Sequence, residues 1–126
     1  MGLESPEKKD FAGIVISMCP GWERYDHIKD AIYGIEEEEV PFKIHKEQHK
    51  PADTIPAAYD AAVQSVFGIG MGCSRKSIVI HHHKLIKQNP LFILLSSRCI
   101  PKTARILGQN AARLVKGMPL RTLPGV

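Results

Sequence analysis

Five short apolar runs, separated by segments with helical spacing, set the strongest constraint on the fold of this chain. Runs of this length are typical of strands, and runs that are apolar at nearly every position indicate strands buried on both faces. We expect a sheet built from residues 11–18, 40–46, 66–71 and 91–95, with 77–83 as a further candidate strand. Residues 40–46 begin with Val-Pro, a placement that indicates an edge strand.

Three segments between these runs have the pattern of helices. From Glu23 to about Glu38 the apolar residues recur at helical spacing. A short alanine-rich helix is expected to begin near Thr54, whose hydroxyl can cap it. A third helix is expected to start at Pro101 and to stop at Gly117. Strands alternating with helices predict an α/β fold, a three-layer sandwich with a mostly parallel central sheet.

Length and composition narrow the class of protein. A chain of 126 residues suits one domain, which we place at residues 11–120 between a polar tail at 1–10 and a C-terminal tail at 121–126. The net charge of +4 is small and its basic residues are spread along the chain, which does not favour nucleic-acid binding. No run is long enough to span a membrane and the polar N-terminus lacks a signal peptide's apolar core, so we expect a cytoplasmic protein.

Other polar or glycine-rich motifs each have a plain structural interpretation. "GIGMGCS" has Cys73 where a dinucleotide-binding loop needs its third glycine, so close backbone packing is favoured. His81 and His83 could lie on one side of a strand, but no nearby residues complete a metal site. The three cysteines have no paired spacing, which favours buried thiols. The residues reveal no catalytic constellation, and the chain is expected to be catalytically inert.

Four consecutive glutamates, Glu36 to Glu39, stand where the first helix should end. A helix C-terminus carries partial negative charge, so carboxylates there do not stabilise the helix. At 100° per residue, Glu37 lies about 200° around the helix from the core residue Ile35. Glu37 should therefore face solvent or a partner.

The blocks "GIEEEEVP", "FGIGMG", "IVIHHHKL", "NPLF" and "RILGQNAARLVKGMPL" resemble, in order and spacing, the small (beta) subunit of glycerol and diol dehydratase reactivases. The resemblance covers roughly residues 11 to 120, and the same blocks occur in the related medium subunit of the dehydratases. A medium subunit carries a longer N-terminal region than this chain, so we rank a dehydratase medium subunit second. A free-standing nucleotide-binding domain is the third interpretation, and the incomplete glycine motif counts against it.

The resemblance implies a non-catalytic subunit of a chaperone-like reactivating factor. Its partner would be a large, actin-like subunit that binds ATP or ADP and hydrolyses ATP, in a complex of two large and two small subunits. That complex would exchange its small subunit for the dehydratase medium subunit and so release damaged cobalamin from an inactivated adenosylcobalamin-dependent dehydratase. The client, glycerol or propane-diol dehydratase, and an association with a bacterial microcompartment stay open.

The resemblance also gives the glutamates a role. The family's metal-reaching glutamate corresponds to Glu37, which would supply an oxygen to a magnesium ion at the large-subunit interface; carboxylate oxygen suits this hard cation. Family members often have glycine where this chain has Glu39, so Glu36 and Glu38 remain alternatives. The family also has a single histidine at about His82, where this chain has three.

Overall fold

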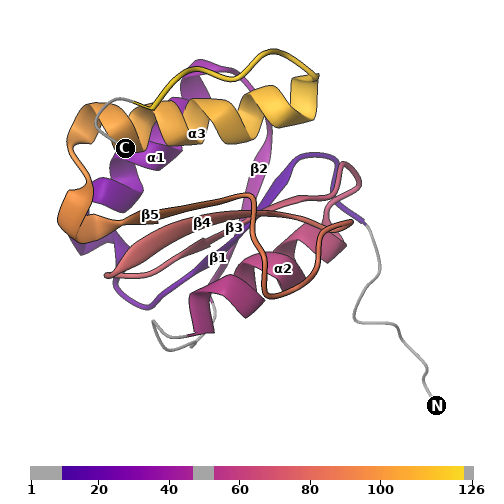
Figure 1. Ribbon diagram of the computed structural model, residues 1–126, viewed down its shortest axis with the longest axis horizontal. Helices are drawn as coiled ribbons and strands as arrows, with labels where there is room; N and C mark the ends of the chain where they lie inside the picture. Colours follow the sequence, from indigo (N-terminus) through magenta and orange to yellow (C-terminus); the bar gives the residue numbers. More distant parts are fainter. Residues whose placement is uncertain (1–9, 47–52, 124–126) are drawn as a thin grey trace.

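The computed structural model describes residues 10–46 and 53–123, which contain a five-stranded sheet with helices on both faces (Figure 1). The strand order is β2-β1-β3-β4-β5. The strands are β1 (Ile14–Met18), β2 (Phe42–Lys46), β3 (Ile69–Cys73), β4 (Ser77–His82) and β5 (Phe92–Leu95). The three α-helices are α1 (Asp26–Glu37), α2 (Thr54–Gln64) and α3 (Pro101–Lys116). The predicted three-layer α/β class is confirmed.

The sheet is mixed, whereas parallel pairing was expected to predominate. β1 pairs in parallel with β2 and with β3, but β4 pairs antiparallel with both β3 and β5. The reason is chain length: β3 and β4 are joined by three residues, a connection that permits only a hairpin, whereas a parallel crossover needs a dozen residues or more. The further candidate strand is confirmed as β4, and β2 lies at the expected edge of the sheet.

Two layers of helix enclose the sheet. Figure 1 shows α1 and α3 together on one face and α2 on the other. The main core lies under α1 and α3, where Ile14, Ile16, Met71, Ile78 and Ile80 of the sheet meet Ile28, Ile35 and Leu107 of the helices. Two single-turn 3-10 helices, η1 (Trp22–Arg24) and η3 (Ser96–Arg98), lead into α1 and α3, so α1 begins three residues later than its pattern predicted.

Helices α1 and α3 approach so closely that only glycine fits at their crossing. A Cβ atom built on Gly108 would lie 1.8 Å from the carbonyl oxygen of Ala31, and one on Gly34 would lie 2.0 Å from that of Arg105. Side chains on the last turn of α1 are thereby brought within reach of α3. This crossing positions the glutamates.

The ends of α3 follow their local signals. Pro101 occupies the first turn, and Gly117 takes the left-handed conformation (φ 69°) as the C-cap. Beyond it the chain returns to α3, where the Arg121 amide donates to Asn110 Oδ1 at 2.7 Å and Leu123 packs against the core. Residues 1–9 of the expected N-terminal tail and 124–126 of the C-terminal tail lie outside the described residues.

Candidate interface at the end of helix α1

Helix α1 ends within the glutamate run, and each glutamate has a different environment. Glu37 is the last helical residue, Glu38 is the C-cap, and Glu39 follows at φ 59°. Glu39 is the one non-glycine residue with positive φ among those the structure describes. It occupies the left-handed position at which glycine carries no Cβ penalty.

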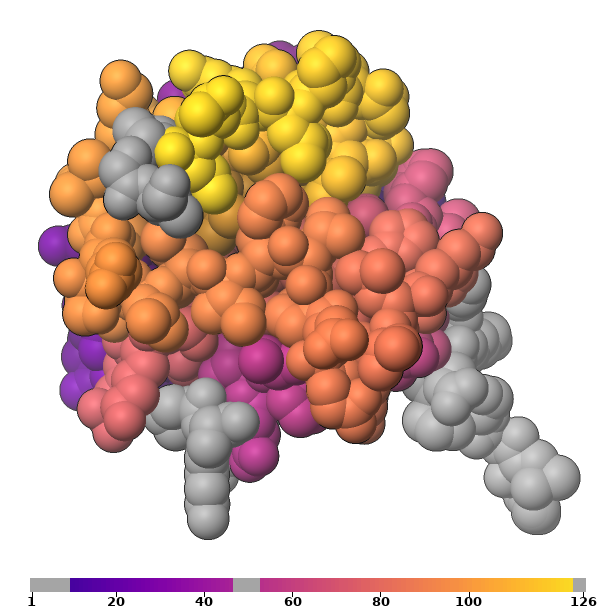
Figure 2. All heavy atoms as spheres, viewed as in Figure 1, coloured from indigo at the N-terminus to yellow at the C-terminus, as the bar shows by residue number. Residues whose placement is uncertain are grey.

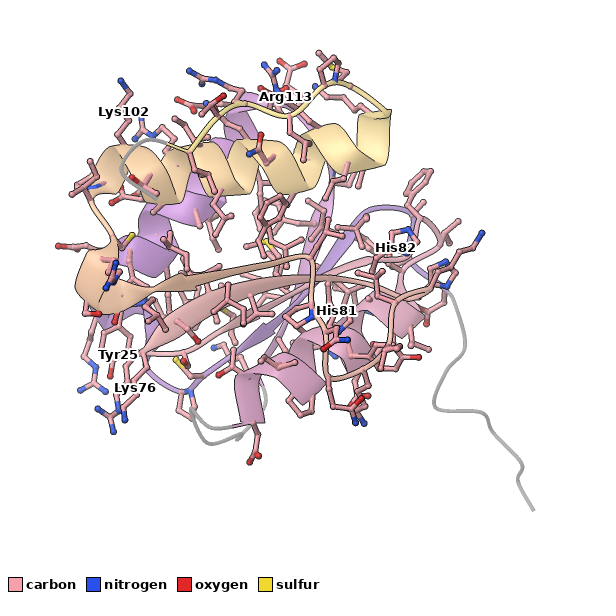
Figure 3. All side chains as sticks on the ribbon, viewed as in Figure 1. Tyr25, Lys76, His81, His82, Lys102 and Arg113 are labelled. Carbon is pink, nitrogen blue, oxygen red and sulfur yellow. The ribbon has the colours of Figure 1, made fainter. Side chains whose placement is uncertain are left out.

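Glu38 turns inward and joins the two helices. Its side chain is 13% exposed, and its carboxylate accepts hydrogen bonds from Lys116 Nζ at 2.8 Å and from Arg113 Nε at 3.2 Å. Figure 3 shows Arg113 on α3 close to the end of α1. Hydrogen bonding to Lys116, followed by that to Arg113, holds the pKa of Glu38 below its usual value against the opposing effect of burial. The carboxylate of Glu38 is therefore already paired with two cations of α3.

Glu37 is half exposed, with 45% of its side chain open to solvent. Its two oxygens have separate partners on α3: Gln109 Nε2 donates to Oε1 at 2.8 Å, and Arg105 Nη1 donates to Oε2 at 3.3 Å. The predicted outward direction holds, but the carboxylate also leans onto α3. Each carboxylate oxygen has a second lone pair, so these contacts leave Glu37 able to accept a further ligand from outside.

Residues that face the glutamates come from α3 and were not identified from the sequence. Arg105, Gln109, Arg113 and Lys116 are spaced by four, four and three residues, which places them on one stripe of a helix. The stripe could have been recognised from the sequence, because these polar and basic residues flank the apolar face of an amphipathic helix and so indicate a polar contact. The sequence does not show which residues they contact, since that depends on how α1 and α3 cross.

The glycine-rich strand β3 is a packing feature, as the sequence indicated. A Cβ on Gly70 would lie 2.2 Å from the Ala62 nitrogen, and one on Gly72 would lie 2.6 Å from the Thr54 carbonyl oxygen. Both glycines therefore lie against the backbone of α2. The glycines of this motif allow α2 to pack directly against the sheet, and that packing explains why glycine is required at both positions.

The histidine run has a structural explanation at its first member. His81, labelled in Figure 3, is fully buried on β4, and its ring lies edge-on to that of Tyr59 of α2, with 5.2 Å between the ring centroids. Its Nε2 donates to the Lys87 carbonyl at 2.9 Å, and its Nδ1 accepts the His82 amide at 2.9 Å. Since both ring nitrogens are engaged, His81 anchors the loop that follows β4. The rings of His82 and His83 lie 4.9 Å apart at the end of that strand.

Within the described ranges, no three His, Cys, Asp or Glu side chains lie close enough together to form a metal site.

The three cysteines form no disulfide, and burial raises the pKa of Cys19, Cys73 and Cys99. None of the helices in the described part of the chain is long and apolar enough to cross a bilayer.

Residues 13–121 match the family described as dehydratase medium subunit. The chain is 45% identical over 93 residues to the propanediol dehydratase-reactivating factor small subunit of Citrobacter freundii, covering 73% of this chain and 77% of that protein. It is 39% identical over 111 residues to the diol dehydratase-reactivating factor small subunit of Klebsiella michiganensis, covering 86% and 81%.

Two solved structures have the same fold. One is of a diol dehydratase-reactivating factor complexed with ADP and Mg2+, with a TM-score of 0.78, 33% identity, and coverage of 90% of this chain and 100% of that one. The other, a glycerol dehydratase reactivase, has a TM-score of 0.77 and 27% identity, with 88% and 97% covered.

An α/β domain of this topology, matched over almost its whole length, defines the class: a protein of the dehydratase medium-subunit type. Within that class, the chain belongs to the family of dehydratase-reactivating factor small subunits. The resemblance noted from the glutamate, glycine and "LGQNAARLVKG" blocks is thereby confirmed.

Proposed function

We propose that this chain is the non-catalytic small subunit of a reactivating factor that releases damaged cobalamin from an inactivated adenosylcobalamin-dependent glycerol or diol dehydratase. The observation that carries the proposal is that the chain is similar to two kinds of subunit. The chain belongs with reactivating-factor small subunits, and its domain also matches the family described as dehydratase medium subunit. Two subunits of one fold can present the same surface to a third protein. Competition for that surface is the physical basis of subunit exchange.

The partner in this proposal is a large, actin-like subunit that binds ATP or ADP and hydrolyses ATP, with two large and two small subunits in the complex. Exchange of the small subunit for the dehydratase medium subunit brings the large subunit against the dehydratase, and steric repulsion opens the cobalamin site. We place the complex in the cytoplasm, with a bacterial microcompartment as a further location. The client is a glycerol or a diol dehydratase.

Glu37 is the residue we propose as a magnesium ligand at the large-subunit interface. Its carboxylate fits the ion: it supplies hard oxygen donors, half of the side chain is open to solvent, and each oxygen has one protein donor. Magnesium usually takes one or two protein carboxylates and keeps several waters, so further ligands from a partner and from water are consistent with one glutamate here. When bound, the ion would join two subunits electrostatically. Glu38 is less suited, since Lys116 and Arg113 already neutralise it.

Reactivation is the direct test. Holo-dehydratase inactivated by bound cyanocobalamin is incubated with ATP, Mg2+, free adenosylcobalamin, the large subunit from the same organism and this chain. We expect dehydratase activity to return and cyanocobalamin to separate from the protein on gel filtration, and both to fail when this chain is omitted. Equal recovery with and without the chain would contradict the proposal.

A medium subunit of the dehydratase itself is the second candidate, because the family match carries that description. Mixing the purified chain with other subunits distinguishes the two candidate functions. A medium subunit restores diol turnover when mixed with the dehydratase's other subunits alone and needs no ATP. A reactivating-factor subunit supports recovery only together with the large subunit and ATP.

A further inference from the structure

Strand β5 ends the sheet with an open edge. It pairs with β4 on one side, and the part of the chain that the structure describes places no strand on its other side. Figure 2 views this side of the molecule, where the segment around β5 runs as a band between α3 and α2. A strand at an edge presents backbone N–H and C=O groups that another strand can pair with.

The exposed side chains of β5 are aliphatic. Side chains alternate along a strand, so Leu94, which is packed in the core under α1 and α3, leaves Ile93 and Leu95 on the opposite face. Helix α2 packs mainly on β3 and β4 and leaves these two residues 48% exposed each. On this side of the sheet, α2 and the loop after β4 also line a hollow with Ile55, Pro56, Lys87 and Gln88. The edge therefore combines open hydrogen-bonding groups with uncovered apolar surface.

The two edges of the sheet differ in how they are protected. The edge strand β2 reads FKIHK, follows Pro41, and carries Lys43 and Lys46. Lysine and proline are the usual means by which proteins keep an edge from pairing with other chains. β5 reads FILL and carries no lysine, although Pro90 precedes it by two residues. One edge is guarded against strand addition and the other is open to it.

The part of the sequence that contains β5 carries positive charge only, although Asp60 of α2 pairs with Lys87 at 3.6 Å. All 13 acidic residues lie at or before Asp60, and the 66 residues after it contain ten lysines and arginines and no acid. The Ser96 amide donates to the Lys76 carbonyl at 2.8 Å, and the Ser96 hydroxyl to the Arg75 carbonyl at 2.9 Å, so both basic residues adjoin the end of β5. Arg98 follows two residues later. None of these three cations forms an ion pair with a residue that the structure describes.

We propose that β5 is a docking edge for an extended segment of another protein, in which apolar and acidic side chains alternate. The segment would add a sixth strand by pairing with the β5 backbone. Its apolar side chains would cover Ile93 and Leu95, and its carboxylates would face Arg75, Lys76 and Arg98. This goes beyond the proposed function and does not depend on it.

The same charges disfavour other occupants. If two copies paired through antiparallel β5 strands, neither would offer the other's Arg98 a free carboxylate, because residues 61–126 contain no acid and Asp60 already pairs with Lys87. Single-stranded nucleic acid binds to basic surfaces through stacked aromatic rings, whereas the exposed side chains of β5 are aliphatic. A strand that alternates apolar and acidic side chains would both pair with the cations and cover the apolar surface.

The test is an NMR titration of the isotope-labelled chain with a capped synthetic peptide of alternating valine and glutamate. We expect saturable shifts of amide signals at residues 75–76 and 92–96, weakened by salt. A matched peptide of valine and lysine should leave these signals unchanged. Ile93→Gln should weaken binding at least about tenfold, because the valine side chains of the peptide would lose apolar surface to cover, and the substitution adds no charge that could attract the glutamates. Ile100→Gln, at an equally apolar and exposed position after the strand, is the control and should bind as the wild type does.

Three results would overturn the proposal. The first is no saturable shift at β5, or equal shifts with the lysine peptide. The second is self-association through β5, detected as concentration-dependent broadening of the same signals without peptide. The third is stronger binding of single-stranded oligouridylate than of the glutamate peptide at these residues.

Discussion

Lys116 Nζ lies 2.8 Å from Glu38 Oε1, and the same ammonium group donates to the Glu38 backbone carbonyl at 2.9 Å. One side chain from the end of α3 thus satisfies both a carboxylate and a free carbonyl at the end of α1. A cation placed there also opposes the partial negative charge of the helix terminus. This explains how the helix tolerates carboxylates at its C-terminus.

Glu38→Gln should lower the free energy of unfolding by about 1–2 kcal/mol near neutral pH, towards the lower end of the range for hydrogen bonds to a charged group, because Arg113 and Lys116 are partly exposed. The pKa of Glu38 is lowered in the folded state, so its contribution is complete above the unfolded value of 4.5 and is lost as pH falls through the lower folded value. Urea unfolding at pH 7 and at about pH 3 checks this sign. A difference between variant and wild type that grows on acidification would contradict it.

Glu39→Gly should stabilise the chain by about 0.5–1 kcal/mol, because glycine removes the Cβ strain of a left-handed residue but loses backbone entropy. Glu39 has φ 59° in the structure. Glu39→Ala is the control: it removes the same carboxylate but keeps the Cβ. Thermal unfolding should rank glycine above wild type and alanine near or below it; equal gains from both variants would assign the effect to charge.

Gly108→Ala should destabilise the chain by about 2–3 kcal/mol, the usual scale for overpacking a tight contact. The new Cβ would lie 1.8 Å from the Ala31 carbonyl oxygen, so α1 and α3 must move apart. Gly117→Ala is a useful comparison, since its Cβ would meet no atom within 4 Å and only the φ of 69° is strained. That variant should lose only about 1–2 kcal/mol. Chemical denaturation of both variants measures the difference.

Local signals explain how much of this structure could be predicted from the sequence. Pro101 and Gly117 mark the limits of α3 correctly because a helix start and a helix stop each depend on a few neighbouring residues. Strand existence also followed from apolar runs. The antiparallel pairing of β4 was missed because direction depends on the connection between strands.

The candidate site was only half predictable for the same reason. The outward position of Glu37 follows from helical geometry alone. The contacts of Glu37 and Glu38 with α3 depend on where two helices cross, and Gly34 and Gly108 set that crossing through backbone contacts between residues more than 70 positions apart. Gln109, Arg113 and Lys116 could be assigned to a polar stripe but not to a partner.

The structure also determines how the proposed magnesium role of Glu37 should be tested. Glu38 cannot serve as a neutral comparison, because it holds α1 to α3 and its loss would change stability. Glu36 is the better control: it is exposed and belongs to the same run. Glu37→Gln keeps the size of the side chain and removes the charge.

Glu37→Gln should weaken magnesium-dependent assembly with the large subunit, while Glu36→Gln assembles as the wild type does. Both variants should unfold within about 1 kcal/mol of wild type, since Glu37 and Arg105 form an exposed ion pair and such pairs contribute little. Affinity for the large subunit is measured by isothermal titration calorimetry with Mg2+ and with a chelator. In the chelator the two variants and wild type should bind alike, because the lost interaction is the one through the ion. An equal defect of Glu37→Gln with and without Mg2+ would instead assign the residue a direct contact with the large subunit, and no defect in either condition would leave Glu37 as a solvated end of α1.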